Sequence, residues 1–201
     1  MPVNPASPFN KPLPKSTRQG LFVLCKTYVA KKSVLLYTCV MQNDAIKYYG
    51  FDPVFDGNSR VLILGSFPSV KSREQAFYYG NKQNRFWRIL SEFYGGAVET
   101  VEDKTALCLT NGVGLWDIVT SCNIVGSLDS DIKDYALADL SAVLNGCDIV
   151  KILCNGAKAY QLTKRAYDGK IPVVKLPSTS SANIRFDKTV WFDNLRLDKE
   201  N

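Results

Sequence analysis

The segment that decides the fold reads Arg60-Val61-Leu62-Ile63-Leu64-Gly65-Ser66-Phe67-Pro68-Ser69, and a second run, Phe77-Tyr78-Tyr79-Gly80-Asn81-Lys82-Gln83-Asn84-Arg85-Phe86-Trp87-Arg88, follows it. Four consecutive apolar residues that end in glycine are typical of a strand buried on both faces of a sheet. The polar turn after them lies where α/β sheets place their sites. From Asn84 the apolar spacing, at Phe86, Ile89, Leu90 and Phe93, becomes helical. The stretch therefore predicts a strand, a long aromatic loop that holds a ligand, and a helix.

The remaining sequence repeats this alternation of strand and helix. Further strands are predicted at residues 112–119, 148–154 and 171–176. Helices are predicted at residues 132–144, with Ser130 or Asp131 as N-cap, and at residues 157–165. Residues 121–131 are rich in Ser, Asn, Gly and Asp, residues 177–183 are a polar, serine-rich run, and both are expected to be loops. The pattern predicts a three-layer α/β/α domain around a central, mainly parallel four-stranded sheet.

The first forty residues have a different composition. Residues 1–19 contain five prolines and are expected to be disordered. Residues 21–40 are apolar but are interrupted by Lys26, Lys31 and Lys32, which argues against a membrane span and favours an extra strand or hairpin. We therefore expect residues 1–40 to be an appended segment and residues 41–201 to form the functional domain.

Composition limits the available chemistry. The chain has no histidine, so Ser-His, Cys-His and His-metal mechanisms are excluded. Its six cysteines show no zinc-type pairing, and reduced core thiols are the simpler interpretation. A formal net charge of +6 favours a polyanionic partner without proving one.

Four blocks of sequence together resemble the uracil-DNA glycosylase superfamily, and most closely its hypoxanthine-DNA glycosylase branch. The resemblance covers roughly residues 51–186. The blocks are Gly65-Ser66-Phe67-Pro68-Ser69 with Phe77-Tyr78-Tyr79-Gly80; Gln83-Asn84-Arg85-Phe86-Trp87; Gly114-Leu115-Trp116-Asp117-Ile118-Val119 with Ser121-Cys122 and Gly126-Ser127-Leu128-Asp129-Ser130; and Leu176-Pro177-Ser178-Thr179-Ser180.

The resemblance implies a DNA repair enzyme that hydrolyses the N-glycosidic bond of a deaminated base, hypoxanthine or alternatively uracil, after the nucleotide rotates out of DNA. It implies no metal and no organic cofactor. We expect a monofunctional glycosylase without a lyase step, because no lysine stands at a convincing pocket position. The expected partner is DNA that contains deaminated bases, not a membrane, and the protein is expected to be a cytoplasmic monomer.

Asn84 is the predicted catalytic residue. Phe67 stands where many members of the superfamily carry the Asp or Asn that positions the attacking water, so another group must do this work. The hypoxanthine branch resembles this chain in having an asparagine just before the Phe-Trp pair, and an amide oxygen can orient a water. The alternative is that Asn84 only caps the helix that follows.

The base-binding pocket is predicted from the same resemblance to contain Ser66, Phe67, Tyr79 and Asp117. Tyr79 would stack on the flipped base, and Ser66 and Phe67 would contribute backbone amides. Asp117 would accept the imino N–H that hypoxanthine and uracil share. The alternatives are loop packing for Tyr79 and loop capping for Asp117.

The DNA-binding residues are predicted to be Ser178, Thr179, Ser180 and Ser181, with Arg85. The resemblance implies that this loop pinches the DNA backbone and that Ala182 or Asn183 fills the gap in the stack. A serine-rich turn is the alternative. The family often has His where Asn81 stands and Pro where Ser181 stands. A cationic rim is expected from Arg73, Lys82, Arg85, Arg88, Lys175 and Arg185.

Two other functions remain open from the sequence. The absent histidine and the presence of Phe67 are compatible with a DNA-binding module of weak catalytic activity. A different small α/β enzyme, such as a nucleotide or nucleoside hydrolase, could share the same strand-loop-helix plan.

Overall fold

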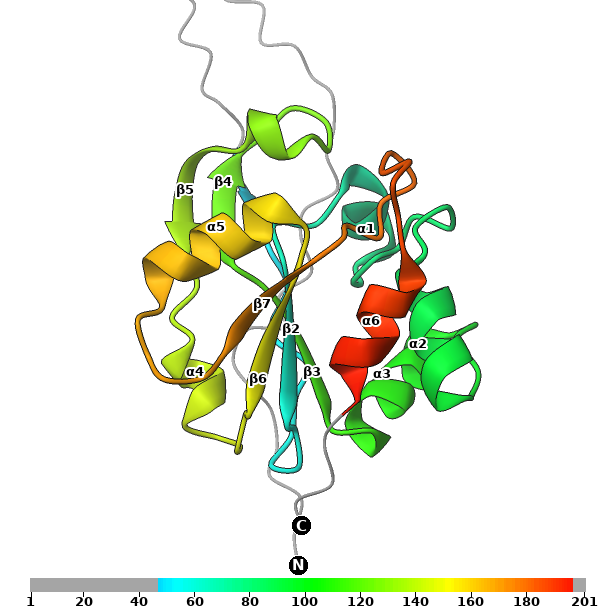
Figure 1. Ribbon diagram of the computed structural model, residues 1–201. Coiled ribbons are helices and arrows are strands. Elements are labelled where there is room, and N and C mark those ends of the chain that lie inside the picture. Colours follow the sequence, from blue (N-terminus) through cyan, green and yellow to red (C-terminus); the bar gives the residue numbers. More distant parts are fainter. Residues whose placement is uncertain (1–46, 197–201) are drawn as a thin grey trace, which may run out of the picture. The chain divides into compact units, whose positions relative to one another are not determined.

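The computed structural model describes residues 47–196 (Figure 1). The predicted appendage at residues 1–40 lies outside the described residues. No helix in the described part of the chain is long and apolar enough to span a bilayer.

The central sheet has four parallel strands in the order β3-β2-β6-β7. These strands are β2 (Val61–Gly65), β3 (Val113–Asp117), β6 (Lys151–Asn155) and β7 (Val173–Leu176). Every residue of β2 is buried, as the apolar run predicts. All four predicted strands are confirmed, although each begins or ends a few residues inside the predicted range.

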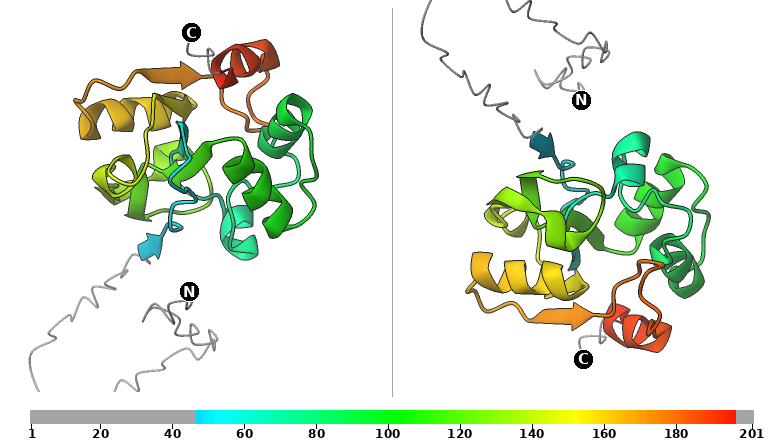
Figure 2. Two further views of the ribbon diagram at one scale, coloured as in Figure 1. Left: turned by 90° about the horizontal axis from the view of Figure 1, so that it is seen from below. Right: turned by 90° about the horizontal axis from the view of Figure 1, so that it is seen from above.

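Helices cover both faces of this sheet, which confirms the predicted three-layer α/β/α architecture (Figures 1 and 2). On one side α5 (Ala157–Ala166) packs against β6 and β7, near α4 (Ser141–Leu144). On the other side α3 (Val101–Thr110) packs against β3, and α2 (Phe86–Tyr94) contacts both α3 and α6 (Lys188–Leu195). The helices α3 and α6, which begin at the capping residues Thr100 and Asp187, were not predicted.

A second, antiparallel sheet corrects two sequence predictions. It has the order β1-β4-β5, from β1 (Lys47–Tyr49), β4 (Val119–Asn123) and β5 (Lys133–Leu137). The predicted loop at 121–131 therefore begins only after Asn123, and its last residues form the short turn η1 (Asp129–Asp131). The predicted helix at 132–144 is wrong. Tyr135 and Leu137 alternate with exposed neighbours and pair with β4, and only α4 is helical.

The long loop after β2 is also more ordered than predicted, because it contains α1 (Val70–Gln75). Ser69 caps this helix by accepting a hydrogen bond from the backbone amide of Ser72. Four cysteines lie in the described part of the chain, all as free thiols, and Cys108, Cys122 and Cys154 are buried. This agrees with the prediction of reduced core thiols for those four.

Candidate active site

A cavity of about 460 Å³ lies at the carboxyl ends of the parallel strands. Its walls come from the strand ends, from the loop after β2, from residues 127–129 and from the loop after β7. Tyr79, Asn84 and Ser178, which the sequence predicts to share one site, all line this cavity. The volume falls in the range of small-molecule sites.

Asp117 ends β3 and lies directly beside Gly65, its parallel partner at the end of β2. A Cβ atom on Gly65 would collide with the Asp117 carboxylate, so only glycine leaves room for this arrangement. Asp117 is 5% exposed, and no described residue donates a hydrogen bond to its carboxylate. Burial, together with the negative charge of Asp129, raises the pKa of Asp117 from 3.8 to about 7. The cavity therefore holds a carboxyl group that titrates near neutral pH.

Ser66 and Phe67 line the cavity beside this carboxyl group. The Ser66 hydroxyl donates a hydrogen bond of 2.5 Å to Oδ1 of Asp129. The backbone amide of Phe67 donates to no group among residues 47–196, so it is available to a ligand. Asp129 was not predicted as a site residue, although it belongs to one of the blocks that carry the resemblance.

Tyr79 is held in a left-handed backbone conformation, with φ of 51°. Its ring stacks on Phe86 at a centroid distance of 3.8 Å, so one ring face already has an aromatic partner. Its hydroxyl is buried and has no hydrogen-bond partner among the described residues. Burial and the nearby Asp117 charge raise the pKa of Tyr79 well above its usual value. Stacking of a base on the ring therefore stays a prediction.

The neighbouring aromatics serve packing. Phe77 stacks on Trp87, and the buried Tyr78 donates a hydrogen bond of 2.9 Å to the carbonyl of Asp52. The indole of Trp87 donates in turn to the carbonyl of Tyr78 at 3.0 Å. These contacts fix the path of the loop that carries Tyr79 to the cavity.

Asn84 borders the cavity just before α2. Its Oδ1 accepts a hydrogen bond of 3.0 Å from the backbone amide of Phe86, so the capping contact that the sequence offers as the alternative is present. A carboxamide oxygen has two lone pairs, and the Asn84 side-chain nitrogen has no partner in the described chain. The bond to Phe86 therefore leaves one lone pair and the side-chain nitrogen of Asn84 able to bind a water. The same bond fixes the direction of the Asn84 side chain.

The loop after β7 is tied to the end of β6. Asn155 donates from Nδ2 to the Thr179 hydroxyl at 2.8 Å and accepts from the Thr179 backbone amide at 2.9 Å. Thr179 is fully buried, and its hydroxyl and backbone amide both bond to Asn155, so its side chain braces the loop. Contact of this residue with DNA stays a prediction. Ser178 and Ser180 are half-buried and Ser181 is exposed, which leaves those three available.

Arg85 also holds this loop. Its guanidinium donates to the carbonyl of Ser180 at 2.7 Å and lies 5.0 Å from the ring centroid of Phe186. Its backbone amide donates to the carbonyl of Thr179. Arg85 thus anchors the loop, and a contact with phosphate would use its remaining donors. Sequence alone did not reveal this role, because the partners lie about a hundred residues away.

The other predicted cations lie in different places. Lys175 and Arg185 line a smaller cavity of about 430 Å³ that shares Ser178 with the active-site cavity. Lys82 and Arg88 are exposed. Arg73 lies over the ring of Tyr48 and donates to the carbonyl of Pro68. The predicted rim is therefore split, with Lys175 and Arg185 near residues 177–183, the loop after β7 that we call the serine loop.

One lysine, Lys71, lines the cavity, although no lysine was expected at a convincing pocket position. Lys71 lies at the cavity wall, but its ammonium pairs with Glu74 at 2.8 Å and is largely exposed. An exposed, ion-paired ammonium lacks the desolvated surroundings that activate a lysine as a nucleophile. Among the described residues, no group of three or more His, Cys, Asp or Glu side chains is placed to hold a metal ion.

Comparisons with known proteins identify the family. Residues 53–198 match the family model of the uracil DNA glycosylase superfamily. A hypoxanthine DNA glycosylase of Methanosarcina acetivorans is 37% identical over 69% of this chain and 90% of the relative, and one of Methanosarcina barkeri is 35% identical over 70% and 90%. A solution NMR structure of a Methanosarcina acetivorans protein, described as a candidate uracil DNA glycosylase, superposes with a TM-score of 0.65 and 34% identity over 75% of this chain and 98% of the other. The chain belongs to the uracil DNA glycosylase superfamily.

Proposed function

We propose that this protein removes hypoxanthine from DNA by hydrolysing the N-glycosidic bond of deoxyinosine. The observation that carries the proposal is the buried Asp117 carboxyl group in a cavity that also contains Asn84 and the serine loop. The choice of hypoxanthine as the base follows the names of the two curated relatives, which are hypoxanthine DNA glycosylases. Uracil presents the same imino N–H beside a carbonyl and is the second base to test.

Asp117 would select the base by its edge. Ionised Asp117 accepts a hydrogen bond but cannot donate one, so it pairs with the N1–H of hypoxanthine. Adenine has a lone pair at N1 in place of this hydrogen, so the buried carboxylate would lose the bond to N1 and face a second acceptor, which is costly. The free amide of Phe67 would donate to the base as negative charge develops on it.

Asn84 would hold the water that attacks. In the reaction the bond between C1′ and N9 breaks, and its electron pair leaves with the base while the sugar gains oxocarbenium character. The water oxygen then bonds to C1′, and its released proton ends on the departed base. The products are free hypoxanthine and an abasic site, with no lyase step, since Lys71 is ion-paired.

The serine loop would bind the DNA backbone. Ser178, Ser180 and Ser181 offer hydroxyl and amide groups, and Lys175 and Arg185 place two positive charges beside Ser178. Asn183 donates from its side chain to the carbonyl of Ser178, so of the two residues expected to enter the stack Ala182 is the less constrained. Ile184, two residues after Ala182, is 92% exposed and offers a larger apolar side chain.

We further propose that the protein acts as a cytoplasmic monomer. The four free thiols of the described chain suit a reducing compartment.

Excision from matched duplexes tests the function. The duplexes carry inosine, uracil, thymine or adenine at one position, and the assay measures free base and the strand break that alkali produces at an abasic site. We expect hypoxanthine release, no release from adenine, and no strand break before alkali. Binding without base release would favour the DNA-binding module, and cleavage of free inosine alone would favour a nucleoside hydrolase.

A further inference from the structure

Two large aliphatic side chains are exposed in the loop between β4 and η1. Val125 is 86% exposed and Leu128 is 65% exposed. We call residues 125–128 the apolar ridge. Single exposed aliphatic residues are common and need no explanation. The ridge differs because the loop that carries it is held rigidly.

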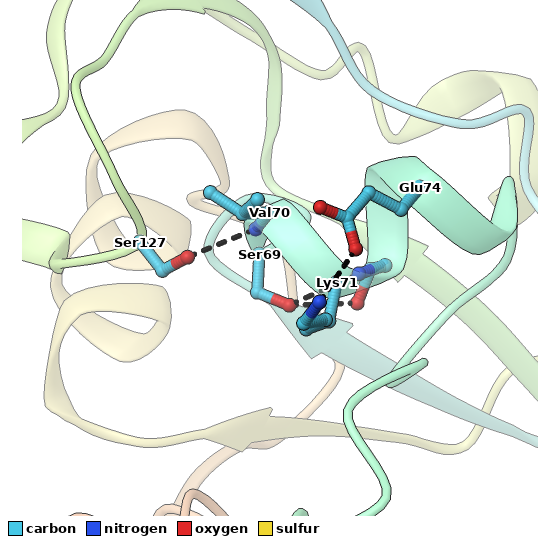
Figure 3. A network of polar contacts seen from close by, with 6 residues as sticks. Ser69, Val70, Lys71, Glu74 and Ser127 are labelled. Carbon is cyan, nitrogen blue, oxygen red and sulfur yellow. Dashed lines mark hydrogen bonds and ion pairs between the residues drawn. The ribbon is translucent and has the colours of Figure 1, made fainter.

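Three hydrogen bonds fix the ridge to the loop after β2. The guanidinium of Arg73 donates to the carbonyl of Gly126 at 3.3 Å, and the backbone amide of Val70 donates to the Ser127 hydroxyl at 2.9 Å (Figure 3). Just beyond the ridge, Asp129 accepts from Ser66. The loop is thus built before any partner arrives, so binding to it costs little conformational entropy.

The ridge lies at the mouth of the active site. Ser127, Leu128 and Asp129 line the active-site cavity, while Val125 and Gly126 line a neighbouring hollow of about 930 Å³. Leu128 is therefore part of the cavity wall and also largely exposed. The serine loop forms another part of the same wall.

We propose that the apolar ridge, chiefly Leu128, packs against the base stack that flanks the extruded nucleotide. This inference rests on the proposed function. A nucleotide in the cavity stays bonded to its strand, so its neighbours must lie at the mouth, where Leu128 is. Extrusion opens a gap in the stack and exposes apolar base faces, and proteins fill such gaps with aliphatic side chains. A rigid, exposed leucine that is continuous with the cavity matches that surface.

The test measures affinity for a duplex whose lesion cannot be excised. A fluorine at C2′ of deoxyinosine destabilises the oxocarbenium character of the sugar and blocks cleavage. The dissociation constant is measured for this duplex and for the same duplex with adenine at the lesion, over a range of salt concentrations. The proteins are wild type, Leu128→Ala and Val150→Ala. Val150 is 39% exposed and directly precedes β6. It therefore lies at the amino ends of the parallel strands, away from the cavity at their carboxyl ends, and serves as a matched control.

We expect Leu128→Ala to weaken binding of the lesion duplex by about tenfold relative to the adenine duplex. An apolar contact releases no counterions, so the slope of log affinity against log salt should not change. Val150→Ala should match wild type. An unchanged lesion preference in Leu128→Ala, or a loss accompanied by a smaller salt slope, would overturn the inference. If wild type releases no base from cleavable duplexes, the proposed function fails instead, which is a separate result.

Discussion

Asn155 and Thr179 exchange two hydrogen bonds, of 2.8 and 2.9 Å, between the end of β6 and the serine loop. Both groups of Thr179 are buried, so removing the Asn155 amide leaves a donor and a hydroxyl without partners. The loop would then lose its position relative to the cavity.

Asn155→Ala should lower the free energy of unfolding by about 1–3 kcal/mol and raise the enzyme concentration that gives half-maximal excision. Denaturant unfolding and single-turnover excision measure the two effects. Asn111→Ala is the control, because Asn111 loses one comparable bond, to the carbonyl of Leu107, at the end of α3. Equal effects of both variants on excision would mean that the brace acts only on stability.

Gly65→Ala should displace the Asp117 carboxylate in the active-site cavity. The added Cβ would meet the Asp117 carboxylate, and both lie in strands that are buried on both faces. We expect at least about a tenfold loss of single-turnover excision, because small displacements of catalytic groups are costly. Gly57→Ala is the control, since its Cβ would have no neighbour closer than 4.0 Å. Wild-type excision by Gly65→Ala would show that the position of Asp117 is unimportant.

The sequence predicted the elements that depend on residues close together in the chain. Val61–Leu64 is apolar throughout because both faces of this strand are buried. Such a run can be recognised in the sequence without knowledge of the tertiary structure. The joint site of Tyr79, Asn84 and Ser178 followed because carboxyl ends of parallel strands share one edge.

The errors arose where distant partners decide the structure. Residues 133–137 carry spacing that suits a helix as well as a strand, and only pairing with β4 selects the strand. Distant partners also explain what was not predicted: the bonds of Thr179 to Asn155 and of Arg85 to the carbonyl of Ser180 join residues far apart in the sequence. The raised pKa of Asp117 depends likewise on packing that the sequence does not display.

Under the proposed mechanism, in which Asn84 holds the attacking water, Asn84→Ala should slow single-turnover excision at least about tenfold because the water loses its acceptor. The same change removes the cap at Phe86 and should lower the free energy of unfolding by about 1 kcal/mol. Asn84→Asp separates the two effects, because a carboxylate still caps the helix and still accepts from water. It should unfold like wild type and excise faster than Asn84→Ala. An unchanged rate in Asn84→Ala would remove this residue from the mechanism.

Asp117 should make excision depend on pH near neutrality. Burial raises its pKa to about 7, and only the ionised form accepts the N1–H of the base, so the single-turnover rate should rise as pH increases through about 7 and then level off. A side-chain amide does not titrate in this range, so Asp117→Asn should lose this step. Identical pH profiles for the two proteins would contradict the assigned role.

The same carboxyl group should make the unfolding of the protein depend on pH. Between pH values of about 4 and 7 the folded state holds a proton on Asp117 that the unfolded chain has released, so its contribution to stability is greatest below this window and falls as pH rises through it. Above pH 7 the folded protein carries a buried carboxylate without a hydrogen bond from the described chain, at a cost of up to about 4 kcal/mol. Asp117→Asn should therefore gain stability relative to wild type as pH increases, and denaturant unfolding at about pH 5 and about pH 8 measures the gain. A gain that is the same at both pH values would show that Asp117 does not titrate inside the folded protein, and the pH dependence of excision would then need another group.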